Sequence, residues 1–159
     1  MNILYLLIIA LSVIIFWQDL KNRTIHVLLA ILLLIVCVTI NLKSDVLLFE
    51  NIGLNTLFLM VNLLGIFIYY SIKNGKIVNP VNQFIGIGDF IFMLAIAPLF
   101  NLKEFILFII CGFIFSLLVH FISNYFKEVK TIPLAGYLAL FIILNISISL
   151  VFNVSTLLL

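Results

Sequence analysis

Long apolar stretches separated by short polar ones set the pattern of this chain. The apolar runs cover about residues 3–17, 25–40, 52–72, 84–100, 105–126 and 132–152. Every charged residue except Asp89 falls in the segments between them. Runs of this kind are typical of membrane spans, and backbone groups in lipid must be satisfied within each segment, which favours helices. The pattern predicts an all-α, polytopic membrane protein with about six transmembrane helices.

The composition strengthens this interpretation. Of 159 residues, 66% are apolar and 9% are charged, and the mean hydropathy is +1.43. Soluble domains carry roughly 25% charged residues, so a water-soluble fold is excluded. We expect one membrane-embedded domain over residues 1–159, with the lipid bilayer as its surroundings. The net charge of +2 is too small to indicate a nucleic acid partner.

The first apolar run raises the question of a secretory signal peptide. It has no basic region before it and no small-x-small cleavage site after it, so we expect a membrane span.

The basic residues predict the orientation of the chain. Cytoplasmic loops of membrane proteins carry an excess of Lys and Arg. The odd-numbered loops hold Lys21, Arg23, Lys73, Lys76, Lys127 and Lys130, whereas the even-numbered loops hold Lys43 and Lys103. Six against two places the odd loops in the cytoplasm and both termini on the non-cytoplasmic side. Asp19, after the first run, and Asp89, at the start of the fourth, then lie at the same face and at similar depth.

Two carboxylates at one membrane face suggest a specific chemistry. A carboxylate beside the bilayer is costly and needs an explanation. When two carboxyl groups share one proton, one can take a proton from water while the other polarises a carbonyl. The pair Asp19 and Asp89 therefore predicts peptide hydrolysis without a metal or a nucleophilic side chain. Gly86 and Gly88, just before Asp89, would let a peptide backbone approach closely.

Simpler roles compete with this hypothesis. Asp89 precedes an apolar helix, where aspartate is a common N-cap, and Asp19 would then be an interfacial polar residue. Gly86 and Gly88 would then be turn-forming glycines. A small ion or proton transporter is a further alternative, although it would favour ionisable groups near the middle of the membrane.

The remaining polar residues have structural interpretations. His26 and His120 are isolated in sequence, so packed or interfacial histidines are favoured over metal ligands. Cys37 and Cys111 lie in apolar runs without a CxxC pattern, which predicts buried free thiols.

Asparagines and several small residues also lie inside the apolar runs. We expect Asn62 and Asn145 to bond to neighbouring helices. Small residues four apart predict close helix packing. These are Gly112 and Ser116, and Ala135 and Ala139.

Three motifs occur in order along the chain. They are Asp-Leu-Lys-Asn-Arg-Thr-Ile at 19–25, Gly-Ile-Gly-Asp at 86–89 and Ile-Pro-Leu-Ala-Gly-Tyr-Leu at 132–138. On these motifs, and on its six-run pattern, the chain resembles the type IV prepilin peptidases, which belong with the GxGD intramembrane aspartyl proteases. It resembles a short form, because it lacks the CxxC-containing methyltransferase region that many members carry.

This resemblance implies a function and a site. It implies an aspartic endopeptidase of the cytoplasmic membrane that needs no cofactor and cleaves short basic leader peptides from pilin-like precursor proteins at the cytoplasmic face. Asp19 and Asp89 would be the catalytic pair. The supporting residues implied by the motifs are Gly86, Gly88, Arg23 and Pro133. N-methylation of the product is not expected.

Several positions differ from the usual family pattern. His26 and Val27 replace a Pro-Asn or Pro-Asp pair, Ile91 replaces a Lys after GxGD, and Gly136 replaces the second Pro of the last motif. These differences motivate the alternative of a catalytically inactive homologue that binds or scaffolds pilin-like helices.

Overall fold

A computed structural model describes residues 2–43, 48–75, 77, 86–126 and 132–152 of the chain. The described residues form helices joined by short connections, without strands among them. The helices are α1 (Asn2–Asn22), α2 (Val27–Lys43), α3 (Leu48–Asn74), α4 (Ile87–Ile96), the 3-10 helix η1 (Ala97–Leu99), α5 (Leu102–Phe126) and α6 (Leu134–Phe152). The prediction of an all-α fold is therefore confirmed for the described residues.

Four of these helices are long and apolar enough to cross a membrane, judged by length and composition. They are α1, α3, α5 and α6, with spanning segments of 18 to 25 residues. The other two, α2 and α4, are apolar but shorter, with 17 and 10 residues. The prediction of a membrane protein is thus supported by four spanning helices. Lys76, Lys127 and Lys130, used above to orient the chain, lie outside the described residues.

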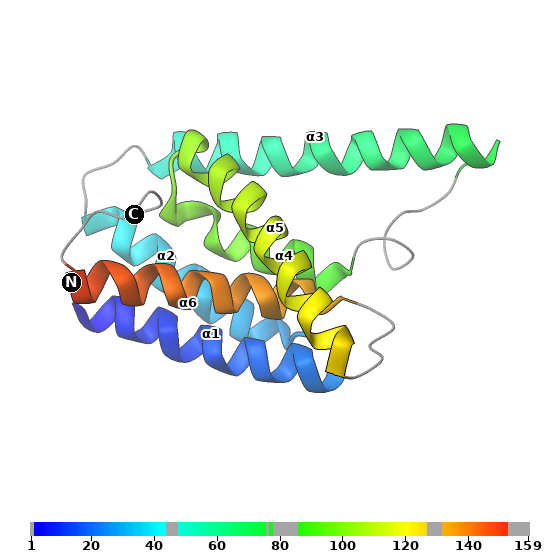
Figure 1. Ribbon diagram of the computed structural model, residues 1–159. Helices are drawn as coiled ribbons and strands as arrows, with labels where there is room; N and C mark the ends of the chain where they lie inside the picture. The colour runs from blue at the N-terminus through cyan, green and yellow to red at the C-terminus, as the bar shows by residue number, and fades with distance from the viewer. Residues whose placement is uncertain (1, 44–47, 76, 78–85, 127–131, 153–159) are drawn as a thin grey trace.

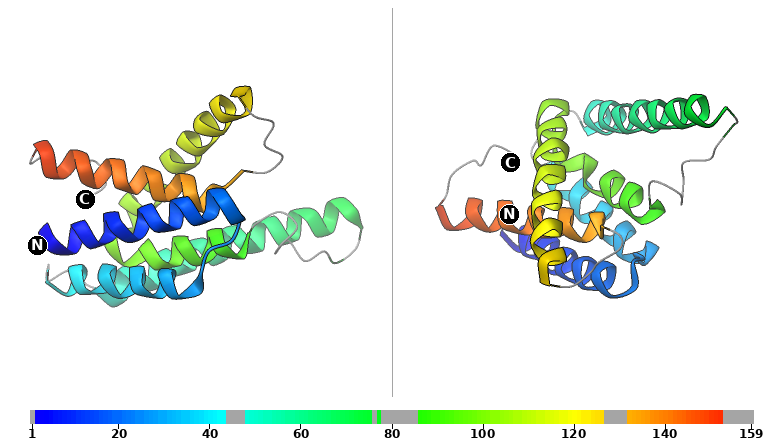
Figure 2. Two further views of the ribbon diagram at one scale, coloured as in Figure 1. Left: turned by 90° about the horizontal axis from the view of Figure 1, so that it is seen from below. Right: turned by 45° about the vertical axis from the view of Figure 1, so that its right-hand side comes forward.

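The helices α1 and α6 lie side by side and antiparallel, so the end of α1 meets the start of α6 (Figures 1 and 2). Helix α2 packs against α1 and α4, while α5 crosses α6. Helix α3 contacts α5, η1 and α2, and its second half extends away from the other helices (Figure 1). This arrangement brings the ends of α1, α4 and α6 together.

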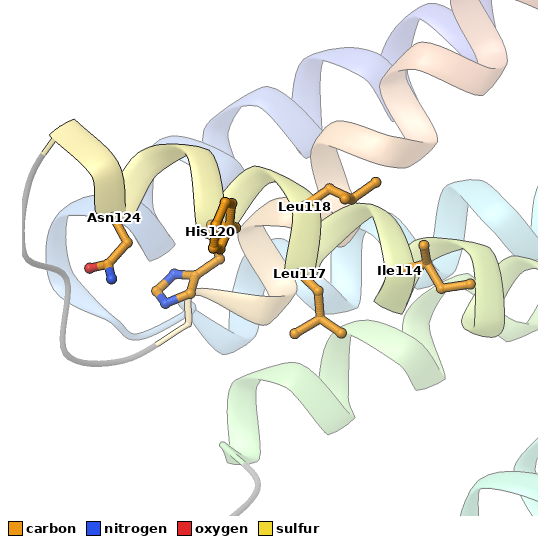
Figure 3. Close-up of a pocket in the computed structure, with 6 residues that line it drawn as sticks. Ile114, Leu117, Leu118, His120 and Asn124 are labelled. Atoms are coloured by element: carbon orange, nitrogen blue, oxygen red, sulfur yellow. The ribbon is translucent and has the colours of Figure 1, made fainter.

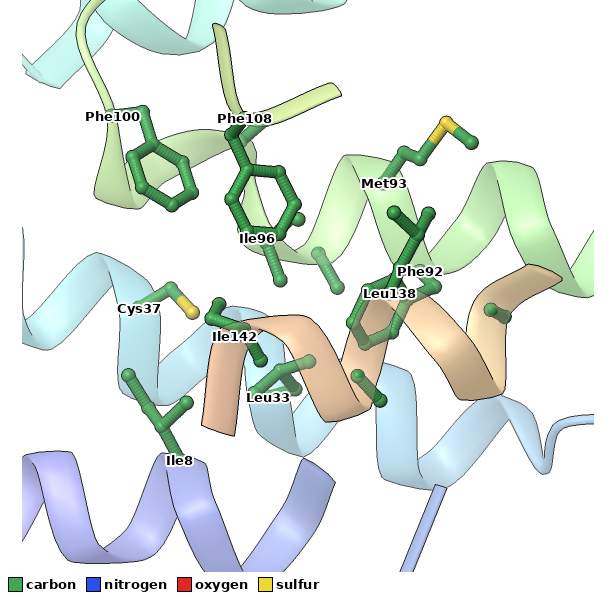
Figure 4. Packing of buried hydrophobic residues seen from close by; sticks show 14 of the residues in the cluster. Ile8, Leu33, Cys37, Phe92, Met93, Ile96, Phe100, Phe108, Leu138 and Ile142 are labelled. Carbon is green, nitrogen blue, oxygen red and sulfur yellow. The ribbon is translucent and has the colours of Figure 1, made fainter. Parts of the chain in front are cut away.

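The core fills the space between α1, α2, α4 and α6 (Figure 4). Its fully buried side chains include Ile8, Leu33, Phe92, Ile96, Leu138 and Ile142. Close packing of α5 on α6 needs a small residue at Gly112, because an added Cβ would meet Leu138 Cδ2 at 2.5 Å. The predicted packing role of Gly112 is therefore confirmed.

Helix α1 is longer than its apolar run. We predicted a span ending near Trp17 and a polar loop holding Asp19, but the helix continues to Asn22. Arg23 then adopts the left-handed conformation (φ 57°), and its N–H donates to the Asp19 carbonyl at 3.0 Å. This is the αL termination of a helix, usually made by glycine. Asp19 therefore lies in the last turns of α1, and its placement in a loop was wrong.

Asn62 and Asn145, both inside spans, do not join helices. The side-chain amides of Asn62 and Asn145 donate to carbonyls of their own helices, at Phe58 and Phe141, both at 2.8 Å. The expectation of bonds to neighbouring helices was therefore wrong. A four-residue separation places such an amide over its own preceding turn, which satisfies it locally.

Helix α3 ends in a turn at Gly75. This residue has φ +62°, and its N–H donates to the Ile72 carbonyl at 3.2 Å.

Candidate active site

The start of α6 has two backbone N–H groups that find no acceptor within the helix. Pro133 immediately precedes α6, and its carbonyl accepts the first helical hydrogen bond, from the Tyr137 N–H at 3.0 Å. The N–H groups of the first turn of a helix have no acceptor within that helix. Ala135 and Gly136 lie in this turn and are both buried. Their amides therefore need acceptors from elsewhere in the fold.

Asp19 and Asp89 supply those acceptors. The Ala135 N–H donates to Asp89 Oδ1 at 2.7 Å, and the Gly136 N–H donates to Asp19 Oδ2 at 2.7 Å. Carboxylates are favoured at a helix N-terminus by its partial positive charge and by charge-assisted hydrogen bonds. Residues 117 and 46 positions away from α6 thus converge on two consecutive amides. The structure brings the two predicted catalytic residues together.

The two carboxylates differ in their surroundings. The Asp19 side chain is only 5% exposed, whereas Asp89 is half-buried. The charges are close enough for Asp19 to act on Asp89 electrostatically, and the charge of Arg23 acts on Asp19. Each carboxylate keeps one oxygen that the α6 amides do not bind, Oδ1 of Asp19 and Oδ2 of Asp89. The pair therefore retains acceptor capacity for a water or a substrate.

Two glycines lie very close to these carboxylates. A Cβ on Gly86 would lie 2.8 Å from Asp89 Oδ2, and a Cβ on Gly136 would lie 3.1 Å from Asp19 Oδ2. The backbone of Gly86 is extended (φ −67°, ψ 134°), a conformation open to any residue, so the turn-forming interpretation was wrong. At both positions an added Cβ would crowd a carboxylate, which would have to move further at Gly86 than at Gly136.

The N-cap interpretation of Asp89 was also wrong. Gly86 is the N-cap of α4, and Asp89 is the third residue of the helix, reaching across to α6. A backbone hydrogen bond from Gly86 also acts on the Asp89 carboxylate. Asp89 therefore joins the start of α4 to the start of α6.

The connection between α1 and α2 packs against the same end of α4. A Cβ on Gly88 would contact the Ile25 side chain at 3.4 Å. The His26 N–H donates to Gln18 Oε1 at 2.9 Å, which ties the start of α2 to the last turns of α1. Gly88 thus supports the site through packing rather than by touching a carboxylate.

The contacts described for the two carboxylates involve no histidine or cysteine. His26 is exposed, and His120 lines an apolar pocket on α5 with Leu117 and Asn124 (Figure 3). Among the described residues, no three His, Cys, Asp or Glu side chains gather as a metal site would require. Cys37 is buried as predicted.

Cys111 differs from its prediction. It is exposed, because it lies on the outward face of α5, so the expectation of a buried thiol was wrong there.

An apolar cavity of about 230 Å³ opens between α3, α4 and α5. Its lining includes Phe90 and Leu134, the residues that follow Asp89 and precede Ala135 in the chain. On its other side are Phe58, Leu63 and Ile66 of α3. The cavity is therefore lined by immediate sequence neighbours of Asp89 and Ala135.

Sequence reasoning missed the two amide donors. Ala135 was assigned only a packing role, and Gly136 was noted only as a departure from the family pattern. A proline at position 136 has no N–H and could not bind Asp19. The usable signal was Pro133, since a proline that starts a helix leaves unpaired donors in the turn after it.

Comparison of the chain with protein-family models, curated proteins and solved structures finds no match.

Proposed function

We propose that this chain is a membrane aspartyl endopeptidase whose catalytic pair is Asp19 and Asp89. Its substrates are pilin-like precursor proteins, from which it removes a short basic leader peptide at the cytoplasmic face of the cell membrane. The observation that carries the proposal is the convergence of both carboxylates on the consecutive amides of Ala135 and Gly136. The identity of the substrate rests on the resemblance of the three motifs to prepilin peptidases.

The proposed chemistry uses the oxygens that α6 leaves available. One carboxyl group carries a proton and donates it to the scissile carbonyl oxygen, while the ionised partner takes a proton from a water molecule. The water oxygen bonds to the carbonyl carbon and forms a tetrahedral diol. Collapse of the diol breaks the C–N bond as the leaving nitrogen gains a proton. Sharing one proton between two close carboxylates is favoured in a buried site.

The amides of α6 would serve this chemistry by fixing the two carboxylates. Each N–H holds one oxygen at 2.7 Å, so neither side chain is free to rotate away. Preorganisation of this kind lowers the barrier, because the groups need not be ordered at the moment of reaction. The negative pair also complements the positive charge of a basic leader peptide.

The apolar cavity beside Asp89 suits the remainder of such a substrate. Precursors of this type join a basic leader to an apolar helix. Side chains of that helix would enter the space between α3 and α4, next to Phe90 and Leu134. The bond to be cleaved would then lie near the carboxylates.

The membrane arrangement is part of the proposal. We infer that α2, and α4 with η1, complete six membrane segments together with the four spanning helices. Both termini then lie on the non-cytoplasmic side, and the start of α6 lies at the cytoplasmic face. The excess of basic residues in the odd-numbered loops supports this orientation.

The test is co-expression of the chain with pilin-like precursors, followed by a gel that detects loss of the leader. We expect cleavage by the wild-type protein and none by Asp89→Asn. Glu50→Gln makes the same chemical change at an exposed carboxylate of α3 and should cleave normally. Cleavage retained by Asp89→Asn would remove this residue from the mechanism. Binding of the precursor without cleavage, unchanged by Asn at both sites, would identify an inactive homologue instead.

A further inference from the structure

A cluster of buried hydrogen bonds holds the end of α4 remote from Asp89. The Asn55 side-chain amide donates to the carbonyls of Ala97 and Phe100 at 2.9 and 2.8 Å. The Asn41 amide donates to the Pro98 carbonyl at 2.6 Å. Asn55 is fully buried and Asn41 is 5% exposed. Two asparagines, from α2 and α3, thus donate hydrogen bonds to three carbonyls around η1. We call Asn41 and Asn55, with these three carbonyls, the asparagine clamp.

The clamp supplies hydrogen-bond donors to backbone carbonyls where α4 ends. Helix α4 ends at Ile96 after ten residues, and Pro98 in η1 has no N–H with which to continue the helical bonding. The last carbonyls of a helix lack helical donors, and burying them unpaired is costly. Of the carbonyls bound here, Ala97 already accepts the Phe100 N–H, but at a long distance of 3.5 Å. Asn41 and Asn55 supply donors from two other helices. The clamp therefore holds η1 against α2 and α3.

The position of the clamp has a consequence for the site. Asp89 lies eight residues before Ala97 on the same short helix, so the helix connects the clamp rigidly to the carboxylate. A slip of one residue would shift Asp89 by about 1.5 Å and rotate it by about 100°. Either change would break the 2.7 Å bond between Asp89 and the Ala135 N–H.

We propose that Asn41 and Asn55 are positioning residues that set the depth and rotation of α4, and through them the placement of Asp89 beside Asp19. The catalytic aspect of this inference rests on the proposed function. The geometric aspect does not, and it can be measured without a substrate.

The start of α4 offers a reporter of its position. A Cβ on Gly88 would lie 3.6 Å from the Ile25 Cβ. Cβ atoms joined by a disulfide are separated by about 3.5–4.5 Å. Ile25→Cys with Gly88→Cys, in a Cys111→Ser background, should therefore form a disulfide rapidly on mild oxidation. Its rate, followed by gel shift in the full-length membrane protein, reports whether α4 keeps its position.

The variant to compare is Asn55→Leu, which keeps a similar size and removes both donated bonds. We expect the disulfide to form on the order of tenfold more slowly. Asn62→Leu is the matched control, because Asn62 lies on the same helix and bonds only to Phe58 of α3 among the contacts described above. The control should form the disulfide at the parent rate.

An Asn55→Leu protein that is monodisperse in detergent and forms the disulfide at the control rate overturns the proposal. If Asn55→Leu does not fold, Asn41→Leu removes the bond to the Pro98 carbonyl and is the deciding variant. A rate equal to that of Asn62→Leu then overturns the proposal in the same way. Slower disulfide formation, together with a wild-type protein that never cleaves a precursor, would keep the clamp and reject the proposed function.

Discussion

At one end of the helical bundle, the carboxylates of Asp19 and Asp89 accept hydrogen bonds from the first turn of α6. At the other end, the amides of Asn41 and Asn55 donate hydrogen bonds to the carbonyls around η1 (Figure 1). Both ends solve the same problem, which is a helix terminus buried without helical partners. The start of a helix requires acceptors and its end requires donors, so the side chains have opposite character.

The two ends differ in the chemistry that their side chains can still perform once these hydrogen bonds are made. A neutral amide that has donated its protons to carbonyls has little further chemistry to offer. A carboxylate that has accepted one bond keeps a second oxygen, a charge and the capacity to hold a proton. For Asp19 and Asp89 the contacts that complete a helix are also those that would hold the proposed catalytic pair in place. We expect changes at the two ends to separate catalysis from stability.

The largest effect is expected from Asp19→Asn or Asp89→Asn. Asparagine retains an oxygen that can accept the α6 N–H, but it cannot exchange a proton. Leader cleavage should fall by about 10²–10⁴-fold, the usual contribution of general acid–base catalysis. The measurement is the initial rate of cleavage of one precursor by equal amounts of folded protein.

The double variant sharpens this result. If the two groups act as one unit, Asp19→Asn combined with Asp89→Asn should be no slower than either single change. Losses that multiply would show that the two aspartates act independently and would contradict a shared catalytic role.

A change in the asparagine clamp should lower stability. In Asn55→Asp the new carboxylate faces the carbonyls of Ala97 and Phe100, where it has no proton to donate. The free energy of unfolding should fall by about 3 kcal/mol, because an uncompensated charge is buried. Thermal unfolding in detergent at neutral pH would measure this loss.

Asn62→Asp provides the comparison on the same helix. Asn62 is exposed and bonds to Phe58 of its own helix, so a charge there is less buried. It should change stability far less than Asn55→Asp does. Equal losses for the two variants would show that the clamp contributes nothing specific.

The sequence predicted the convergence of the site better than the length of its helices. The placement of Asp19 and Asp89 at one end follows from the alternation of spans, whatever the exact boundaries. Pro133 also marked correctly where the last helix begins. These features are local, or depend only on the direction in which each helix runs.

What could not be predicted depends on partners far away in the chain. Helix α1 continues through Asp19, and the buried carboxylate is satisfied by Gly136, 117 residues later. Pro98 marks the end of α4 locally, but the partners that satisfy the carbonyls there, Asn41 and Asn55, come from other helices. Asn55 and Asn62 look equivalent in an apolar run, yet only Asn55 reaches another helix. Hydropathy is a property of each segment alone and does not contain these contacts.

A smaller effect is expected from Gly136→Ala. The new Cβ would lie 3.1 Å from Asp19 Oδ2 and displace it by a few tenths of an ångström, while the N–H donor remains. Small misplacements of catalytic groups are costly, so cleavage should fall about tenfold with little loss of stability. Gly53→Ala is the control, because a Cβ there meets nothing within 4 Å. An unchanged cleavage rate in Gly136→Ala would argue against tight positioning of Asp19.

The smallest effect is expected at a helix start that water can reach. At the beginning of α5, Asn101 Oδ1 accepts from the Glu104 N–H at 3.0 Å and Glu104 Oε2 accepts from the Asn101 N–H at 3.2 Å, a reciprocal capping box. Asn101→Ala should lower the free energy of unfolding by about 1 kcal/mol, measured by thermal unfolding. Cleavage per folded molecule should stay at the wild-type rate. The chemistry resembles that at α6, but Asn101 is exposed, so water can replace the lost acceptor. A loss as large as that of Asn55→Asp would show that burial is not what distinguishes these helix ends.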